Sequence, residues 1–105
     1  MDEQFYEKIN KFIDALTQKN DEVIYAMTHG GCYWFARTLL SRFVSEIDCE
    51  LMYNPKENHF ACRMGDYLFD ATGEISKDGF ETWANYQMFD PIHSERIKRD
   101  CVYIV

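Results

Sequence analysis

The chain has 105 residues, of which 47% are hydrophobic and 16% aromatic, so it is long enough for one domain with one core. Its formal net charge of −7 argues against nucleic-acid binding, because a phosphate backbone attracts clusters of lysine and arginine. The first residues lack the features of a signal peptide, and no stretch reaches transmembrane length. We therefore expect a single cytoplasmic domain over residues 1–105, with no nucleic-acid or membrane partner.

Two amphipathic helices are predicted first. Apolar residues recur at helical spacing over about Glu3 to Lys19 and predict the first helix. Residues 22–29 fit either a short helix or an extended segment. A second helix is predicted from Cys32 to about Ile47. Its apolar side is formed by Phe35, Ala36, Leu39, Leu40, Phe43 and Ile47.

An antiparallel meander of three strands is predicted next. The strands cover about residues 49–53, 58–64 and 67–72, and the turns between them cover residues 54–57 and 65–66. Alternation along the strands predicts one strongly apolar face. That face contains Cys49, Leu51, Phe60, Cys62, Phe69 and Ala71.

The remaining residues predict a mixed tail. Asp78 resembles the N-cap of a short helix that carries Phe80 and Trp83, and Asp90-Pro91 predicts the start of another helix through Ile97. Residues 101–105 predict a final strand. The fold class is therefore α+β, with two N-terminal helices, an antiparallel β-meander and a mixed helix/strand tail.

The chain contains four cysteines, which lie far apart and are expected to be free thiols: Cys32, Cys49, Cys62 and Cys101. Cys32 differs from the others because it opens the second predicted helix. The amino end of a helix carries partial positive charge, which lowers the pKa of a thiol and favours the nucleophilic thiolate. A buried, unreactive thiol is the alternative interpretation.

His59 and Asp70 lie on successive strands after this cysteine. If residues 65–66 form a two-residue hairpin loop, Ala61 lies opposite Asp70, and His59 and Asp70 share one face as diagonal neighbours. A cysteine at a helix start followed by histidine and a carboxylate is typical of a nucleophile, its base and an orienting group. Asp70 could instead cap the turn that follows it.

The face that carries His59 also carries Ala61 and Leu68. For the three residues to meet, the cysteine helix is expected to cover Ala61 and Leu68, with the first helix or the tail on the opposite face. The aromatic side chains at helical spacing, Trp34, Trp83, Tyr86 and Phe89, are expected to be core residues rather than the lining of a pocket.

Three segments resemble the papain-like cysteine peptidase superfamily in its compact bacterial form, which includes cell-wall endopeptidases and transglutaminase-like domains. Gly31-Cys32-Tyr33-Trp34 resembles its nucleophile motif, and His59-Phe60-Ala61 resembles its histidine strand. Tyr67-Leu68-Phe69-Asp70-Ala71-Thr72-Gly73 resembles the carboxylate strand. The resemblance covers about residues 25–73 and implies a papain-like core.

The resemblance also implies an activity on amide, thioester or isopeptide carbonyls of a protein or peptide substrate, without a cofactor. Cys32 would attack the carbonyl, His59 would act as base and then as acid, and Asp70 would fix the histidine tautomer. The backbone N–H of Cys32 would donate to the oxyanion, but no glutamine stands before it as a second donor. The candidates for that role are Tyr25, Thr28 and His29.

Two other functions compete with this one. The H-x-x-C spacings of residues 29–32 and 59–62 suit zinc, but alternation along the strand points His59 and Cys62 to opposite faces, so no metal site is expected. The second is a non-enzymatic interaction or inhibitor protein that binds a basic protein partner. Its acidic surface would be formed by Asp2, Glu3, Glu7, Asp14, Asp21 and Glu22.

Overall fold

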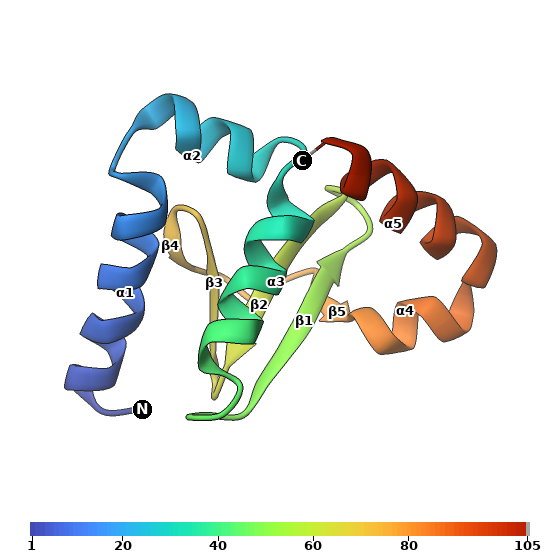
Figure 1. The fold of residues 1–105 in the computed structure, drawn as a ribbon. Coiled ribbons are helices and arrows are strands. Elements are labelled where there is room, and N and C mark those ends of the chain that lie inside the picture. The colour runs from blue at the N-terminus through green and yellow to red at the C-terminus, as the bar shows by residue number, and fades with distance from the viewer. Residues whose placement is uncertain (105) are drawn as a thin grey trace.

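Three helices precede a five-stranded sheet, and two more helices end the chain (Figure 1). The computed structural model describes the backbone of residues 1–104 and the side chains of residues 1–97 and 99. The helices are α1 (Glu3–Thr17), α2 (Asp21–Thr28), α3 (Cys32–Phe43), α4 (Trp83–Phe89) and α5 (Pro91–Ile104). The strands are β1 (Cys49–Asn54), β2 (His59–Met64), β3 (Tyr67–Asp70), β4 (Gly73–Ile75) and β5 (Glu81–Thr82). The predicted α+β class and the antiparallel meander are confirmed.

The additional helix is α2, which occupies the segment that the sequence left open between a helix and an extended strand. Its start is defined by Asn20, whose side-chain oxygen accepts hydrogen bonds from the backbone N–H groups of Glu22 (2.9 Å) and Val23 (3.3 Å). These bonds satisfy donors that the first turn of a helix leaves unpaired. The helix is only eight residues long, which explains its weak periodicity in the sequence.

The strands lie in the order β4-β3-β2-β1-β5, and each neighbouring pair is antiparallel. The register of β2 and β3 places Met64 opposite Tyr67, as a two-residue loop requires, so the predicted hairpin is confirmed. The loop between β1 and β2 covers residues 55–58 instead of 54–57, which shifts this register by two residues. An even shift keeps every side chain on its predicted face.

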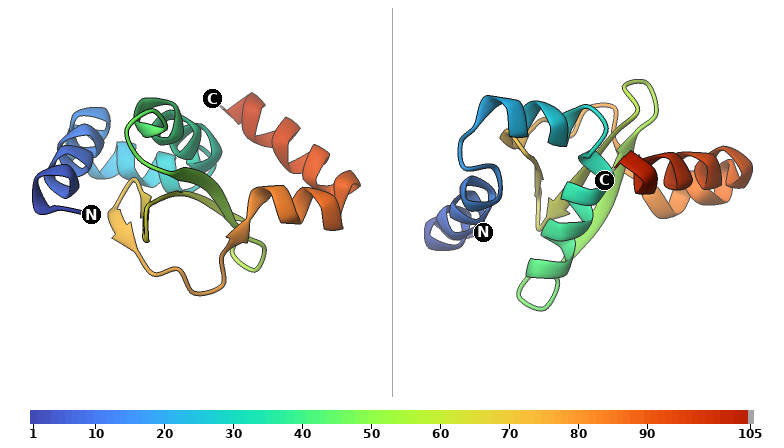
Figure 2. Two further views of the ribbon diagram at one scale, coloured as in Figure 1. Left: turned by 90° about the horizontal axis from the view of Figure 1, so that it is seen from below. Right: turned by 45° about the horizontal axis from the view of Figure 1, so that its top comes forward.

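Helices cover the apolar face of the sheet, as the left panel of Figure 2 shows. The side chains of α3 pack there with those of α1, because both helices present an apolar stripe that only an apolar surface can bury. The buried cluster contains Ile9, Ile13, Phe35, Leu39, Phe43, Cys62, Met64, Phe69 and Ala71. A second cluster under the first turn of α3 contains Cys32, Tyr33, Ala36, Tyr53, Phe60, Trp83 and Ile97.

The position of α3 corrects the prediction that this helix covers Ala61 and Leu68. Both residues are buried, but they lie with His59 on the opposite face of the sheet. That face is crossed by the connection from β4 to β5, residues 76–80 (Figure 2). The prediction was wrong because the apolar stripe of α3 packs against the continuous apolar face of the sheet. His59 and Asp70 lie on the other face.

The tail differs from its prediction in two places. No helix follows Asp78 directly, since Gly79 has φ +83° and residues 81–82 form β5 along β1. The helix α4 begins afterwards, with Thr82 Oγ1 accepting a hydrogen bond from the Asn85 N–H at 3.1 Å. The predicted strand at 101–105 is also wrong, because α5 continues to Ile104; Val105 lies outside the described residues.

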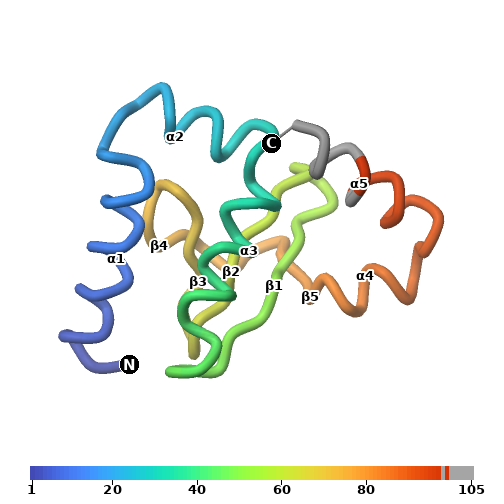
Figure 3. The backbone as a smooth tube through the Cα atoms, in the orientation of Figure 1, coloured from blue at the N-terminus to red at the C-terminus, as the bar shows by residue number. Residues whose placement is uncertain are grey.

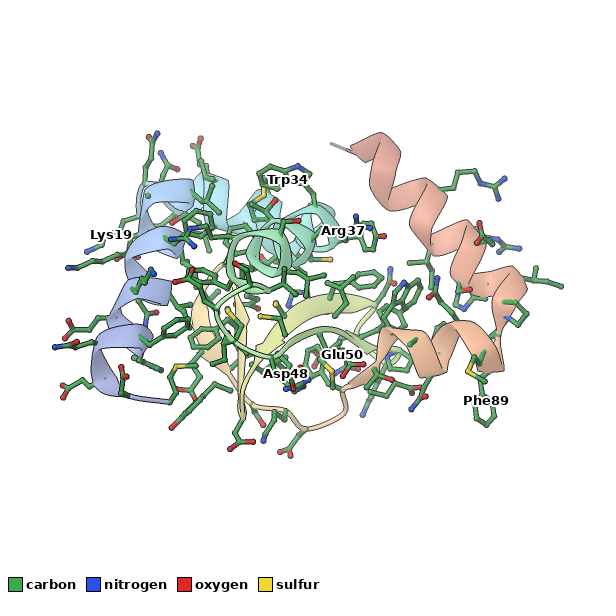
Figure 4. All side chains as sticks on the ribbon, turned by 60° about the horizontal axis from the view of Figure 1, so that its bottom comes forward. Lys19, Trp34, Arg37, Asp48, Glu50 and Phe89 are labelled. Atoms are coloured by element: carbon green, nitrogen blue, oxygen red, sulfur yellow. The ribbon has the colours of Figure 1, made fainter. Side chains whose placement is uncertain are left out.

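The start of α5 agrees with its prediction. Asp90 accepts a hydrogen bond from the His93 N–H at 3.0 Å, and Pro91 is the first helical residue. Of the aromatic side chains in the tail, Trp83 is core, whereas Phe89 is exposed at the end of α4 (Figure 4). In residues 1–104 no helix combines the length and the apolar composition needed to cross a membrane.

Candidate active site

Cys32 occupies the first position of α3, directly after a sharp corner between α2 and α3 (Figure 3). Gly30 makes the corner with φ +129°, a conformation that glycine adopts without steric cost. The Gly31 N–H donates to the Ala26 carbonyl at 2.9 Å and ties the corner to α2. Gly31 provides no side-chain cap, so the first N–H groups of α3 remain available to the thiol or to a ligand.

The Cys32 thiol lies beside β2, the strand that carries His59, and not above a face of the sheet. The ring of Tyr33, next to Cys32, contacts the ring of Phe60 with centroids 4.9 Å apart. The backbone N–H of Phe60 lies close enough to the Cys32 sulfur to lower the pKa of the thiol. Because strand N–H groups lie in the plane of the sheet, the sulfur lies beside β2, where the described pairing with β3 has ended at Cys62. This position lets α3 remain on the apolar face while Cys32 reaches His59.

His59 is held by Asp70, as the hairpin register predicts. The His59 Nε2 lies 2.8 Å from Asp70 Oδ2, and the two side chains are only 13% and 9% exposed. The other oxygen, Oδ1, accepts hydrogen bonds from the Thr72 N–H at 2.7 Å and the Thr72 hydroxyl at 2.5 Å. The two interpretations of Asp70, as an orienting group and as a turn cap, therefore both hold, one for each oxygen.

The contact with Asp70 determines the histidine tautomer. An ionised carboxylate only accepts hydrogen bonds, so the Nε2 of His59 must carry a proton. The other ring nitrogen, Nδ1, is then the atom that exchanges a proton with the Cys32 thiol. This is the orientation that a general base requires.

The pKa directions agree with an ion pair between the thiol and the histidine. Burial raises the pKa of Cys32, but the hydrogen bonds from His59 and from the Phe60 backbone outweigh it, and the pKa is lowered. Burial lowers the pKa of His59, but Asp70 and Cys32 raise it to about 9. Burial raises the pKa of Asp70, but His59 and Thr72 lower it below its ordinary value. These shifts favour a thiolate beside an imidazolium and an ionised aspartate.

A cleft of about 660 Å³ opens on the side of His59 and Asp70. Its lining consists of Thr28, His29, Asn54, Glu57, His59, Asp70, Thr72, Ile75, Ser76, Asp78 and Phe80. The volume is within the range of pockets that bind small molecules or a few residues of a peptide. Cys32 is 4% exposed and does not belong to the lining, whereas Asp70, although it is also buried, does.

Two of the three sequence-based candidates for a second oxyanion donor, Thr28 and His29, are already engaged. The Thr28 hydroxyl donates to carbonyl oxygens of its own helix, those of Ile24 at 3.0 Å and Tyr25 at 3.1 Å. The His29 ring stacks on Tyr25 at 3.9 Å, and its Nδ1 lies 3.0 Å from the Tyr25 carbonyl. A carbonyl oxygen only accepts, so Nδ1 holds the proton of a neutral His29 and leaves its Nε2 without one. Tyr25 is 63% exposed and does not line the cleft, so none of the three is placed as a free neutral donor in the cleft.

Sequence reasoning missed Asn54 as a site residue. It is the last residue of β1, it lies directly opposite His59 in the β1–β2 pair, and it lines the cleft. Its Oδ1 accepts hydrogen bonds from the backbone N–H groups of Lys56 (3.1 Å) and Glu57 (3.2 Å), which fixes the orientation of the amide. An asparagine before a proline in a predicted turn was the available signal, and it indicated only a turn.

The zinc alternative has no support in this arrangement. Within residues whose side chains are described, no three His, Cys, Asp or Glu residues converge as metal ligands do. His59 and Cys62 point to opposite faces of β2, because they lie three positions apart along the strand. Among the described cysteines, Cys32, Cys49 and Cys62 are free thiols.

The chain matches the family model described as Phage YunG-like protein over residues 9–99, and it therefore belongs to the Phage YunG-like family. The matched span includes Cys32, His59 and Asp70, and the description states no activity. Comparisons with curated proteins and with solved structures found no match.

Proposed function

We propose that this member of the Phage YunG-like family is a thiol enzyme that acts on an amide, thioester or isopeptide carbonyl of a protein or peptide. Cys32 is the nucleophile, His59 the base and acid, and Asp70 the orienting group. The observation that carries the proposal is the His59–Asp70 bond of 2.8 Å beside a thiol whose pKa is lowered by the same histidine. The resemblance of the three motifs to papain-like peptidases supports it, and a papain-like core is part of the proposal.

Acylation follows from the ion pair. The Cys32 thiolate attacks the carbonyl carbon, a C–S bond forms, and the carbonyl oxygen takes the negative charge. The N–H of Cys32 at the start of α3 donates to this oxygen. The tetrahedral intermediate then collapses, the bond to the leaving amine or thiol breaks, and His59 gives its Nδ1 proton to the leaving group. The product is a thioester on Cys32.

Deacylation needs a second nucleophile from solution. The neutral His59 takes a proton from water or an amine, which attacks the thioester carbonyl. The C–S bond breaks and Cys32 leaves as a thiolate. Water gives hydrolysis or deamidation, and an amine gives acyl transfer.

We place this reaction in the cytoplasm, where free thiols such as those of Cys32, Cys49 and Cys62 are maintained.

Selective alkylation tests this proposal. Iodoacetamide at neutral pH should label Cys32 before Cys49 and Cys62, because burial raises the pKa of both other thiols, that of Cys62 to about 12. Peptide mapping by mass spectrometry gives the labelling rate of each cysteine. His59→Ala should slow labelling of Cys32 without changing the order of the others. Equal rates for Cys32 and Cys49, or no effect of His59→Ala, would contradict the proposal.

A second candidate function is an acidic interaction protein that binds a basic protein partner. Two observations favour it: the net charge of −7, and the 4% exposure of Cys32. Its surface would include Asp14, Asp21 and Glu22 on α1 and α2, of which Asp14 lies 3.7 Å from the Lys19 ammonium. Charge reversal at these three residues should then abolish binding of a basic protein, while Cys32→Ala leaves it unchanged.

A further inference from the structure

Two acidic side chains of the cleft have no partner. Glu57 and Asp78 line the cleft from the β1–β2 loop and from the β4–β5 connection. Among the described side chains, neither carboxylate takes part in an ion pair or accepts a hydrogen bond. The lining contains no lysine and no arginine. Outside the His59–Asp70 pair, the cleft therefore presents two uncompensated negative charges.

The same cleft also has an apolar surface beside His59. Ile75 and Phe80 contribute it, and the Phe80 ring centroid is 6.1 Å from that of His59. Lysine and arginine side chains bury their methylene stems on apolar surface and keep the charged end in a polar environment. An aromatic ring adds an attraction for a cation above its face. The cleft thus matches an amphipathic cationic side chain better than a neutral or acidic one.

Asn54 adds an unused hydrogen-bond donor to the same cleft. The residue is 5% exposed, its Oδ1 is held by two backbone N–H groups, and its Nδ2 donates to no described group. Because no buried side-chain nitrogen or oxygen among the described residues lacks a hydrogen-bond partner, this Nδ2 is open to the cleft, where a ligand can accept a hydrogen bond from it. Because Asn54 faces His59 across the β1–β2 pair, the acceptor would lie near the reacting centre. The backbone carbonyl of a peptide is such an acceptor.

We propose that this cleft is the binding site for a lysine or arginine side chain of a polypeptide substrate. Glu57 and Asp78 receive the cation, Ile75 and Phe80 contact its stem, and Asn54 Nδ2 donates to a backbone carbonyl of the same peptide. The role of this peptide as a substrate rests on the proposed function, whereas its binding does not.

Binding of a matched peptide pair tests the cation site. Two fluorescent peptides that differ only in one arginine or citrulline have nearly the same shape and differ in charge. Fluorescence anisotropy with the Cys32→Ser protein measures both affinities without chemistry. The arginine peptide should bind more tightly, and Glu57→Gln and Asp78→Asn should each reduce its advantage by about two- to fivefold. Higher salt should reduce it as well.

The matched control is the single variant Asp66→Asn. It removes one charge, as each cleft variant does, but from the hairpin loop at the other end of β2, so it should leave the arginine advantage unchanged. Equal affinity for the two peptides in the parent protein would overturn the proposal. An equal loss in the cleft variants and in the control would show attraction by net charge alone, and it would overturn the proposal too.

Asn54 is tested by a variant that keeps its structural bonds. Asn54→Asp retains an oxygen that accepts from the backbone of the loop and removes the Nδ2 donor. It should weaken binding of the citrulline peptide, and unchanged binding would remove Asn54 from the site. Alkylation of Cys32 by iodoacetamide in the parent protein separates the two proposals: a reactive Cys32 with no arginine preference refutes only the cation site. An arginine preference with an unreactive Cys32 refutes only the enzyme.

Discussion

A single carboxylate connects the turn after β3 to the chemistry of the candidate site. One oxygen of Asp70 is fixed by Thr72, which leaves the other oxygen to orient His59. A carboxylate without the Thr72 contacts could rotate and lose the histidine, so the turn contributes to the preorganisation of the base. The sequence predicted the pairing of His59 and Asp70, because a two-residue loop sets the register. It did not predict the role of Asn54, because its free amide depends on the loop conformation.

Asp70→Asn should uncouple His59 from the thiol. An asparagine amide donates to Nε2, favours the tautomer with the proton on Nδ1, and removes the negative charge that raises the pKa of His59. That pKa should fall from about 9 towards its ordinary value of 6.5, as NMR titration of the imidazole signals can show. The kcat of any substrate turned over should fall by up to about 10⁴-fold. A His59 pKa that stays near 9 would assign its shift to Cys32 rather than to Asp70.

The pH dependence of kcat/KM should be bell-shaped. Activity should increase with pH through the lowered pKa of Cys32, since only the thiolate attacks. It should decrease above about 9, where His59 loses the proton that it gives to the leaving group. Asp66→Asn, in the hairpin loop far from the site, is the control, and its pH profile should keep both the rising and the falling limb. A profile without a descending limb up to pH 10 would exclude His59 as the acid.

At the scale of elements, the sequence predicted the features that depend on residues close together in the chain. The helix spacing of α3, the hairpin loop at residues 65–66 and the Asp90-Pro91 start of α5 all depend on neighbours in sequence. The predicted cap at Asp78 failed because residues 81–82 pair with β1, and this long-range pairing requires extended backbone. The strand predicted at 101–105 failed although Val, Tyr and Ile favour strands, because residues 101–104 continue the helix that begins at Pro91 and strand preference depends on packing in a sheet.

The corner between α2 and α3 should control the reactivity of Cys32. Gly30→Ala introduces a side chain at φ +129°, which costs about 1–3 kcal/mol and should displace the first turn of α3. Thermal unfolding and the rate of Cys32 alkylation should both decrease. Gly65→Ala, at φ +60° in the distal hairpin, is the matched control, which should lose stability but keep the alkylation rate. Parallel loss of reactivity in both variants would indicate a general effect of destabilisation.

The candidate site is formed at one end of the whole molecule rather than by one element. The start of α3, the β1–β2 loop and the turn after β3 meet there, and the β4–β5 connection adds Asp78 and Phe80 (Figure 1). The sequence could not place this connection, since nothing local to residues 76–80 indicates which sheet face it crosses. The cleft on the face opposite the helices therefore depends on where the β4–β5 connection crosses the sheet, which only the whole fold determines.

The stability of the whole protein should report the ion pair. In unfolded protein the ordinary pKa values are 6.5 for His59 and 9.0 for Cys32, whereas folding raises the first to about 9 and lowers the second. The histidine contribution is fully present below pH 6.5 and is lost as the pH rises through about 9. The cysteine contribution has the opposite sign, because it is present above pH 9.0 and is lost as the pH falls through the lowered pKa.

Between pH 6.5 and about 9, wherever the pH exceeds the lowered pKa of Cys32, the two contributions oppose each other, and the unfolding free energy of the parent protein should change little there. Cys32→Ser removes one of them, while Asp70 still raises the pKa of His59, so this variant should lose stability across the same window. The slope of the loss can reach about 1.4 kcal/mol per pH unit. Denaturant unfolding at several pH values measures both slopes. Asp70 and Cys62 are present in both proteins, so their own contributions cancel when the two slopes are compared. Identical slopes in the two proteins would show that Cys32 stays protonated, and the thiolate–imidazolium pair would have to be abandoned.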